Sequence, residues 1–121
     1  MDFEVVALDH VQLAMPPGRE ADAESFYCGL LGFTRVPKPE RLAVRGGCWF
    51  ERGTVKLHLG VEKDFRAAKK AHPALVVRGL DELVAKLEAA KVPIRPDDEI
   101  PGVKRVHVDD PFGNRIELID G

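Results

Sequence analysis

Apolar and more polar residues alternate over positions 8–15 of the chain. Because successive side chains of a β-strand point to opposite faces, this alternation predicts a strand with one face on a core and the other on more polar surroundings. The second face carries His10 and Gln12. The core face carries Val11, Leu13 and Met15.

The period of the pattern then changes from that of a strand to that of a helix. Apolar residues at helical spacing predict a helix over residues 19–31, and Gly32 is a typical signal for its end. A short strand is expected over 33–36. The next two apolar runs, 41–51 and 54–59, predict a hairpin.

A turn at residues 52–53 sets the expected register of this hairpin. Phe50 then lies opposite Val55 on the core face, and Gly47 lies opposite His58 on the other face. The hairpin is therefore expected to direct His58 away from the core.

The second half of the chain repeats this order of elements. The turn Asp110-Pro111-Phe112-Gly113 fixes the last register and places His107 opposite Glu117. Between the halves, the charged segment 61–71 is expected to form a solvent-exposed helix. The predicted elements of the second half are a strand over 74–78, a helix over 80–90, a short strand over 92–95 and a hairpin of strands 103–109 and 114–119.

Titratable residues recur at equivalent places in the two halves. His10 and His72 begin the first strands and His58 and Glu117 lie on the last strands, with separations of 48 and 45 residues. We interpret the chain as two copies of one β-α-β-β-β unit in a single α+β domain. Each unit is expected to form a curved mixed sheet with its helix on the outer face. The units span about 5–61 and 71–120.

The composition limits the classes of function. The chain has 121 residues, of which 45% are hydrophobic and 31% charged, and this is typical of one globular domain. A net charge of −2 with interspersed acids and bases leaves no basic stripe for nucleic acid. No apolar run approaches the length of a membrane span, so we expect a cytoplasmic protein. Cys28 and Cys48 lack the spacing of a metal or redox motif and are expected to be buried or incidental thiols.

Four side chains of metal-ligand type lie on the strand faces turned away from the helices: His10, His58, His72 and Glu117. Two curved sheets facing one another would bring these four to a common point. Imidazole and carboxylate donors suit zinc, nickel, manganese or iron. A single strand histidine is more often an ordinary polar residue, but the repeated position on one face favours a site. His107 is open to three interpretations: a partner that supports Glu117, a proton shuttle, or a polar strand residue.

Four motifs extend this pattern over nearly the whole chain. They are His-Val-Gln-Leu at 10–13, Phe-Tyr-Cys-Gly-Leu-Leu-Gly-Phe at 26–33, His-Pro-Ala-Leu-Val-Val at 72–77, and Asp-Pro-Phe-Gly-Asn-Arg-Ile-Glu-Leu-Ile at 110–119. The chain thereby resembles the vicinal oxygen chelate superfamily, which includes glyoxalase I, fosfomycin-resistance thiol transferases, bleomycin-resistance proteins and extradiol dioxygenases. The motifs are specific for the fold and much less specific for the reaction.

The resemblance implies metal ligands at His10, His72 and Glu117. His58 matches the fourth ligand position, which is glutamate or glutamine in familiar glyoxalases, so it is a candidate for either a ligand or a proton-transferring base. The resemblance also implies a homodimer, in which His10 and His58 of one subunit meet His72 and Glu117 of its mate.

Three functions are open at this point. The first is a metal-dependent lyase, isomerase or transferase that chelates a small substrate through vicinal oxygens, with His58 or His107 moving protons. The second is a non-catalytic ligand-binding protein of the bleomycin-resistance kind, and the third is an iron-dependent extradiol dioxygenase. The candidate substrate-binding residues are Gln12, Trp49, Lys56, Arg105 and Arg115.

Overall fold

The computed structural model describes residues 2–121 as eight strands and four short helical segments. The helical segments are α1 (Glu20–Glu24), the π-helix η1 (Ser25–Leu30), α2 (Glu40–Ala43) and α3 (Leu80–Ala89). The strands of the first half are β1 (Val11–Met15), β2 (Thr34–Val36), β3 (Cys48–Arg52) and β4 (Val55–Val61). Those of the second half are β5 (Ala74–Val77), β6 (Arg95–Asp97), β7 (Arg105–Asp109) and β8 (Arg115–Asp120).

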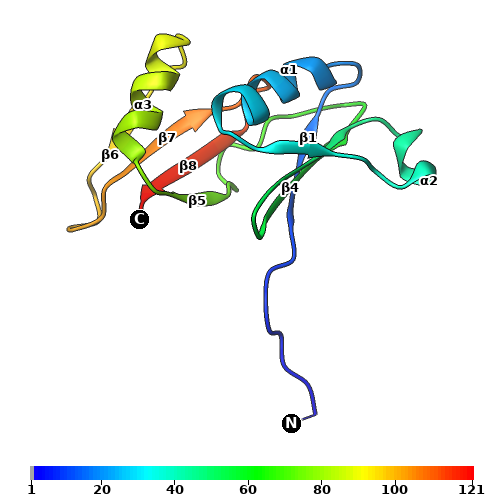
Figure 1. Cartoon of the computed structure of the whole chain (residues 1–121), viewed down its shortest axis with the longest axis horizontal. Helices are drawn as coiled ribbons and strands as arrows, with labels where there is room; N and C mark the ends of the chain where they lie inside the picture. The colour runs from blue at the N-terminus through cyan, green and yellow to red at the C-terminus, as the bar shows by residue number, and fades with distance from the viewer. Residues whose placement is uncertain (1) are drawn as a thin grey trace.

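Each half of the chain forms one four-stranded mixed sheet (Figure 1). The strand orders are β1-β4-β3-β2 and β5-β8-β7-β6. In each sheet the first and last strands of the unit pair in parallel, and the other neighbours pair antiparallel. The predicted tandem β-α-β-β-β architecture of an α+β fold is thus confirmed.

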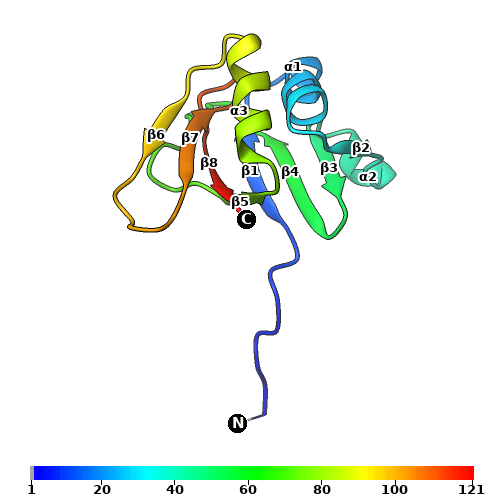
Figure 2. The ribbon, with the colours of Figure 1, turned by 60° about the vertical axis from the view of Figure 1, so that its left-hand side comes forward.

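The helices cover the sheets on one side, where α3 lies beside η1 (Figure 2). The core faces of both sheets and the apolar stripes of the helices join in one hydrophobic cluster. Burying side chains of this size contributes about 1.5–3 kcal/mol each, so this cluster is the main reason why the sheets and helices hold together. Its largest fully buried members include Tyr27, Phe50, Met15, Leu57, Leu87 and Ile116.

Three buried polar residues, Tyr27, Asp110 and Asn114, connect the two units, and we call them the inter-unit joint. Asn114 donates from Nδ2 to the carbonyl of Ala14 in β1 at 2.9 Å, and its Oδ1 accepts from the N–H of Ala68 at 2.9 Å. The Tyr27 hydroxyl donates to Asp110 at 2.7 Å. Because these bonds are buried, breaking any of them leaves an unsatisfied polar group. The joint therefore fixes the angle between the two sheets.

The first hairpin has the predicted faces but a different register. Trp49, rather than Gly47, lies opposite His58, and the turn falls at residues 53–54 rather than 52–53. The pairing thus slips by two residues. Since side chains alternate with a period of two, this slip keeps each of them on its predicted face.

The strand predicted from residue 41 is wrong in its first part. Residues 40–43 form the one-turn helix α2, and pairing begins only at Cys48. Gly46 and Gly47 lie between them with φ angles of +75° and +84°. Such left-handed backbone cannot continue an extended strand, which explains the late start of β3.

The helix predicted over 61–71 is also wrong. β4 continues through Val61, and the segment that follows is irregular. Its backbone bonds to the last hairpin instead: the carbonyl of Ala68 accepts from the N–H of Arg115 at 2.8 Å. A short charged segment without an apolar stripe gains too little from helix formation to compete with such contacts.

The short strand predicted over 92–95 forms later, as β6. β6 is an edge strand, so it accommodates Pro96, which has no N–H to donate. This displacement places Asp97 opposite Arg105 of β7.

Residues 3–8 form an extended arm that runs away from the rest of the molecule (Figures 1 and 2). The strand predicted from residue 8 starts only at Val11. The arm exposes 77–90% of each of its large apolar residues. Such a set of exposed apolar side chains is typical of a segment that packs on another molecule. These residues are Phe3, Val5, Val6 and Leu8.

Candidate metal centre

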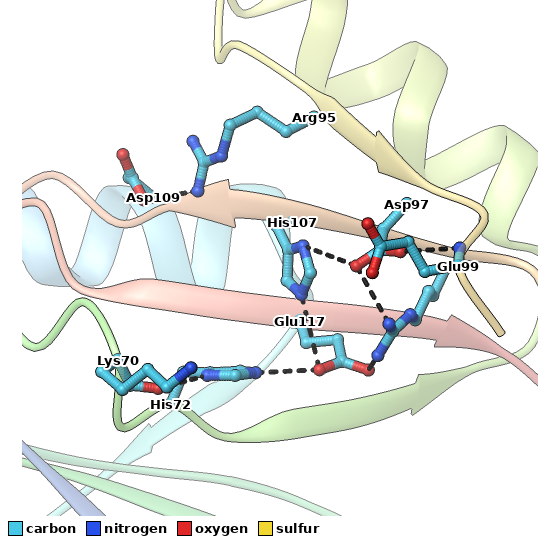
Figure 3. A network of polar contacts seen from close by, with 9 residues as sticks. Lys70, His72, Arg95, Asp97, Glu99, His107, Asp109 and Glu117 are labelled. Carbon is cyan, nitrogen blue, oxygen red and sulfur yellow. Dashed lines mark hydrogen bonds and ion pairs between the residues drawn. The ribbon is translucent and has the colours of Figure 1, made fainter.

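Three side chains of metal-ligand type meet on the second sheet, and we call them the second-unit cluster: His72, His107 and Glu117 (Figure 3). Their candidate ligand atoms all lie within 4.8 Å of one another. The antiparallel register pairs His107 with Glu117, as predicted. The parallel pairing of β5 with β8 sets Ala74 beside Glu117, so His72, two residues earlier, reaches the same face.

Both histidines of the cluster direct Nε2 at the same oxygen of Glu117. The distance from Oε1 is 2.8 Å for His72 and 3.5 Å for His107. The other ring nitrogen of His72 lies 2.8 Å from the carbonyl oxygen of Lys70. That of His107 lies 3.7 Å from Asp97 Oδ2. Each ring thus has one nitrogen toward the centre of the cluster and one toward an outer acceptor.

Arg105 holds the other oxygen of Glu117. Its guanidinium lies 3.0 Å from Glu117 Oε2 and 3.0 Å from Asp97 Oδ2, so this predicted substrate-binding residue is already engaged with two carboxylates. Burial alone would raise the pKa of Glu117. The hydrogen bonds from His72 and Arg105 outweigh burial, and the pKa of Glu117 lies below its ordinary value. The cluster therefore presents an ionised carboxylate to the two imidazoles.

Asp97 belongs to this network, although the sequence analysis did not identify it. The predicted strand ended at residue 95, which left Asp97 in a loop. Proline is rare within β-strands because it has no N–H to donate, so the residues around Pro96 do not suggest a strand. Only the tolerance of edge strands for proline could have indicated that Asp97 pairs with Arg105.

The donor set of the second-unit cluster fits a divalent ion. The carbonyl of Lys70 can only accept, so Nδ1 of His72 carries a proton, and Nε2 of the same ring is the nitrogen that faces Glu117 Oε1. With a proton on Nε2, the 2.8 Å contact is a hydrogen bond to the carboxylate, and a divalent ion would take the place of that proton.

The first sheet carries a second group of predicted site residues. The ring of His58 lies between those of His10 and Trp49, with both centroid distances 4.2 Å. Burial lowers the pKa of His58, and His10 lowers it further. A hollow of about 400 Å³ adjoins these rings, and its lining also includes Lys56 and Glu51.

The other predicted substrate-binding residues differ in how they are held. Lys56 lies 4.0 Å from the carboxylate of Asp9. The amide of Gln12 packs over Gly60, where a Cβ would come within 2.6 Å of Gln12 Nε2. Arg115 has a buried Nε with no hydrogen-bond acceptor among the described residues.

The four predicted ligands therefore form two pairs and do not meet at one point within the described chain. His10 stacks on His58, and His72 contacts Glu117. A cleft of about 1080 Å³ lies between the facing edges of β1 and β5, and its lining includes His10 and His72.

Comparison with known proteins decides the family. The sequence profile of the Glyoxalase/Bleomycin resistance protein/Dioxygenase superfamily matches residues 7–118. The chain belongs to this superfamily. The likeness extends to solved structures, although a search of curated proteins finds no match.

A glyoxalase family protein from Bacillus anthracis is 44% identical, with a TM-score of 0.95 over 100% of this chain and 99% of that one. Lactoylglutathione lyase from Agrobacterium tumefaciens is 22% identical, with a TM-score of 0.69 over 92% of each chain. The fosfomycin resistance protein FosX from Listeria monocytogenes is 13% identical, with a TM-score of 0.76 over 98% of this chain and 95% of that one. The last two share the superfamily fold, and their names alone do not assign a reaction to this chain.

Within residues 2–121, no helix has both the length and the apolar character needed to cross a bilayer.

Proposed function

We propose that this protein is a metal-dependent enzyme of the glyoxalase-like superfamily, a lyase, isomerase or transferase that acts on a small substrate with two neighbouring oxygens. The observation that carries this proposal is the cluster of His72, His107 and Glu117, whose candidate ligand atoms all lie within 4.8 Å of one another. A bound divalent ion, such as zinc, nickel, manganese or iron, would supply Lewis acidity toward the substrate oxygens. Superfamily membership adds support but does not by itself assign the reaction.

The side chains around the cluster have distinct proposed tasks. His72 and Glu117 hold the ion, and Arg105 fixes the carboxylate so that Oε1 remains available. His58 moves a proton at its ring nitrogen, since burial and His10 favour its neutral, basic form at neutral pH. Arg115 is proposed to bind an anionic group of the substrate through its guanidinium.

We further propose that the site is shared between the subunits of a homodimer. Within one chain His10 and His58 lie apart from Glu117, and two copies related by a twofold axis could bring each pair to its complement. The arm supports this arrangement, because its exposed apolar residues need a surface to pack on. The cleft between β1 and β5 of a second copy offers apolar side chains and two unpaired strand edges.

A second candidate function, an iron-dependent dioxygenase, is favoured by one observation. Two histidines and one carboxylate in a cluster form the ligand set of many non-haem iron oxygenases. Oxygen uptake with catechol and added ferrous ion would support this candidate. A metal-loaded protein that consumes no oxygen with catechol would favour the lyase, isomerase or transferase.

We place the protein in the cytoplasm. Cys28 and Cys48 are free thiols, and this is in keeping with a reducing compartment.

Metal analysis of protein purified without chelators, and reloaded with zinc or nickel, tests the proposed function. We expect close to one ion per chain for the wild-type protein and at least a tenfold loss of affinity for His72→Ala. Lys70→Ala is the matched control, because it changes the neighbouring side chain but keeps the carbonyl that orients His72. A wild-type protein that retains no ion after reloading would contradict the metal-dependent proposal.

A further inference from the structure

We propose that His107 is a third protein ligand of the ion, so that the second unit of one chain holds the metal by itself. This inference rests on the proposed function, since it requires that the cluster take a divalent ion. It adds a ligand on β7 that the superfamily resemblance does not imply, and it makes metal retention a property of the single chain.

The two histidines of the cluster approach Glu117 in the same manner. Both rings direct Nε2 at Oε1, at 2.8 Å for His72 and 3.5 Å for His107 (Figure 3). Their planes are nearly perpendicular, at 88°, with centroids 5.5 Å apart. The two Nε2 atoms therefore approach one region from different directions, as neighbouring ligands of an ion do.

The outer nitrogen of each ring faces an acceptor, as is usual for metal-bound histidines. For His107 this acceptor is Asp97, which lies 3.7 Å from Nδ1. Asp97 is itself fixed by Arg105 at 3.0 Å and by the N–H of Glu99 at 3.0 Å. The carboxylate therefore lies on the Nδ1 side of the ring, and Nε2 is the nitrogen directed at the cluster.

The charges within the network leave room for a cation. Asp97 and Glu117 each contribute one negative charge, and Arg105 neutralises one of the two. These three side chains therefore leave one negative charge in excess. A divalent ion at the convergence of the Nε2 atoms would compensate this charge in a setting where the side chains of His107 and Glu117 are only 15% and 8% exposed.

The other two interpretations of His107 fit the geometry less well. An ordinary polar strand residue would be expected to face solvent rather than lie between two carboxylates. A proton shuttle needs a route to solvent, whereas both ring nitrogens of His107 face carboxylate oxygens. With His107 as ligand, one chain would supply three donors and leave positions open for two substrate oxygens.

Cobalt(II) is a suitable probe, because a thiolate bound to it gives an intense charge-transfer band in the near ultraviolet. We expect His107→Cys to show this band when titrated with cobalt(II). Asp109→Cys is the matched control, since residue 109 lies on the same strand and the same face, two positions along. The Asp109→Cys control should show no such band. Neither should the wild-type protein, whose cysteines are Cys28 and Cys48.

Affinities provide an independent measurement. We expect His107→Ala to weaken cobalt(II) binding at least tenfold, as His72→Ala does, whereas His10→Ala should change it less than threefold. Wild-type binding with no band in His107→Cys would overturn the inference, even if His107→Ala binds more weakly, because a positioning residue would act in that way. Loss of binding in His10→Ala would also overturn it. If the wild-type protein binds no cobalt(II), the proposed function fails together with the inference.

Discussion

At the scale of single residues, Tyr27 is the only tyrosine of the chain and is fully buried. Burial raises the pKa of Tyr27 well above its ordinary value, and the negative charge of Asp110 raises it further. A folded-state pKa above the unfolded one means that the neutral hydroxyl contributes full stability below about pH 10, and that this contribution is lost as the pH rises further.

The alkaline titration of Tyr27 is therefore a direct test of the inter-unit joint. We expect tyrosinate absorbance to stay low above pH 10 for as long as the protein is folded, and to appear together with loss of the circular dichroism signal. In denaturant, the same residue should titrate near pH 10. Above pH 10 the wild-type protein should lose more stability than Tyr27→Phe, which has no phenol to ionise. Tyrosinate formation near pH 10 in a folded protein would contradict the buried contact with Asp110.

Individual residue roles were predictable where they depend on strand faces alone. His107 and Glu117 were correctly paired because a clear turn sequence fixed their register. The role of Asp97 was not predictable, because it depends on where an edge strand begins. Nor does the alternation of polar and apolar residues indicate that Arg105 lies between two carboxylates, since it does not reveal which partners share a face across strands.

At the scale of elements, the start of β3 depends on two glycines in left-handed conformation. A Cβ at Gly47 would lie 2.2 Å from the carbonyl oxygen of Leu59 in the paired strand. At Gly53, in the hairpin turn, a Cβ would meet no atom within 4 Å. The two positions share a positive φ but differ in the space around them. Comparing alanine variants at both therefore distinguishes the cost of backbone strain from the cost of a steric clash.

We expect Gly47→Ala to lower the free energy of unfolding by on the order of 3 kcal/mol, because it combines backbone strain with a clash against the paired strand. Gly53→Ala should cost only about 1 kcal/mol, since it adds strain alone. Urea denaturation of both variants provides the measurement. Equal losses at the two positions would show that strand pairing does not depend on the close approach at Gly47.

Element types were predicted better than element boundaries, for a physical reason. The long apolar stripe of α3 and the alternation in β1 both reflect burial, which the sequence records directly. The boundaries of β3 and β6 depend instead on positive φ angles and on the position of an edge strand. Many different sequences are compatible with these features, so the boundaries are harder to predict. The helix predicted over 19–31 also changes to a π-helix from Ser25, where the N–H of Leu31 bonds to the carbonyl of Phe26 at 3.0 Å.

At the scale of the whole molecule, the arm and the cleft between β1 and β5 lead to a prediction about assembly. Two arms that each bury four apolar side chains on a second copy would cover on the order of 1,500 Å² in total, which is the size of a standard interface. One chain cannot use its own arm in this way, because the arm runs away from its own sheets.

We expect the wild-type protein to sediment as a dimer, and a variant with Phe3→Asp and Val5→Asp to dissociate at least 100-fold more readily. The reason is that each copy would lose two buried apolar side chains and gain two charges at the interface. Val44→Asp is the matched control, because Val44 is 85% exposed but lies outside the arm. Sedimentation velocity over a range of concentrations measures the difference. An unchanged association constant would contradict arm exchange.

How the sheets lie relative to one another could not be predicted, because it depends on contacts between distant residues. Asn114 bonds to Ala14, one hundred positions away, and Tyr27 bonds to Asp110 across 83 positions. No periodic pattern encodes such pairings. The sequence motif around Asp110 did mark the residues involved, although their function as a connection between the units became visible only in three dimensions.

The inter-unit joint has one more consequence. In the proposed homodimer, the angle between the two sheets of each chain would set the width of the two proposed sites, although Tyr27, Asp110 and Asn114 line neither of the two hollows described above. The width of the entrance to each site would thus depend on three buried residues that do not line it. A substitution at this joint would therefore be expected to change the size of substrate that the proposed site accepts without changing any of its ligands.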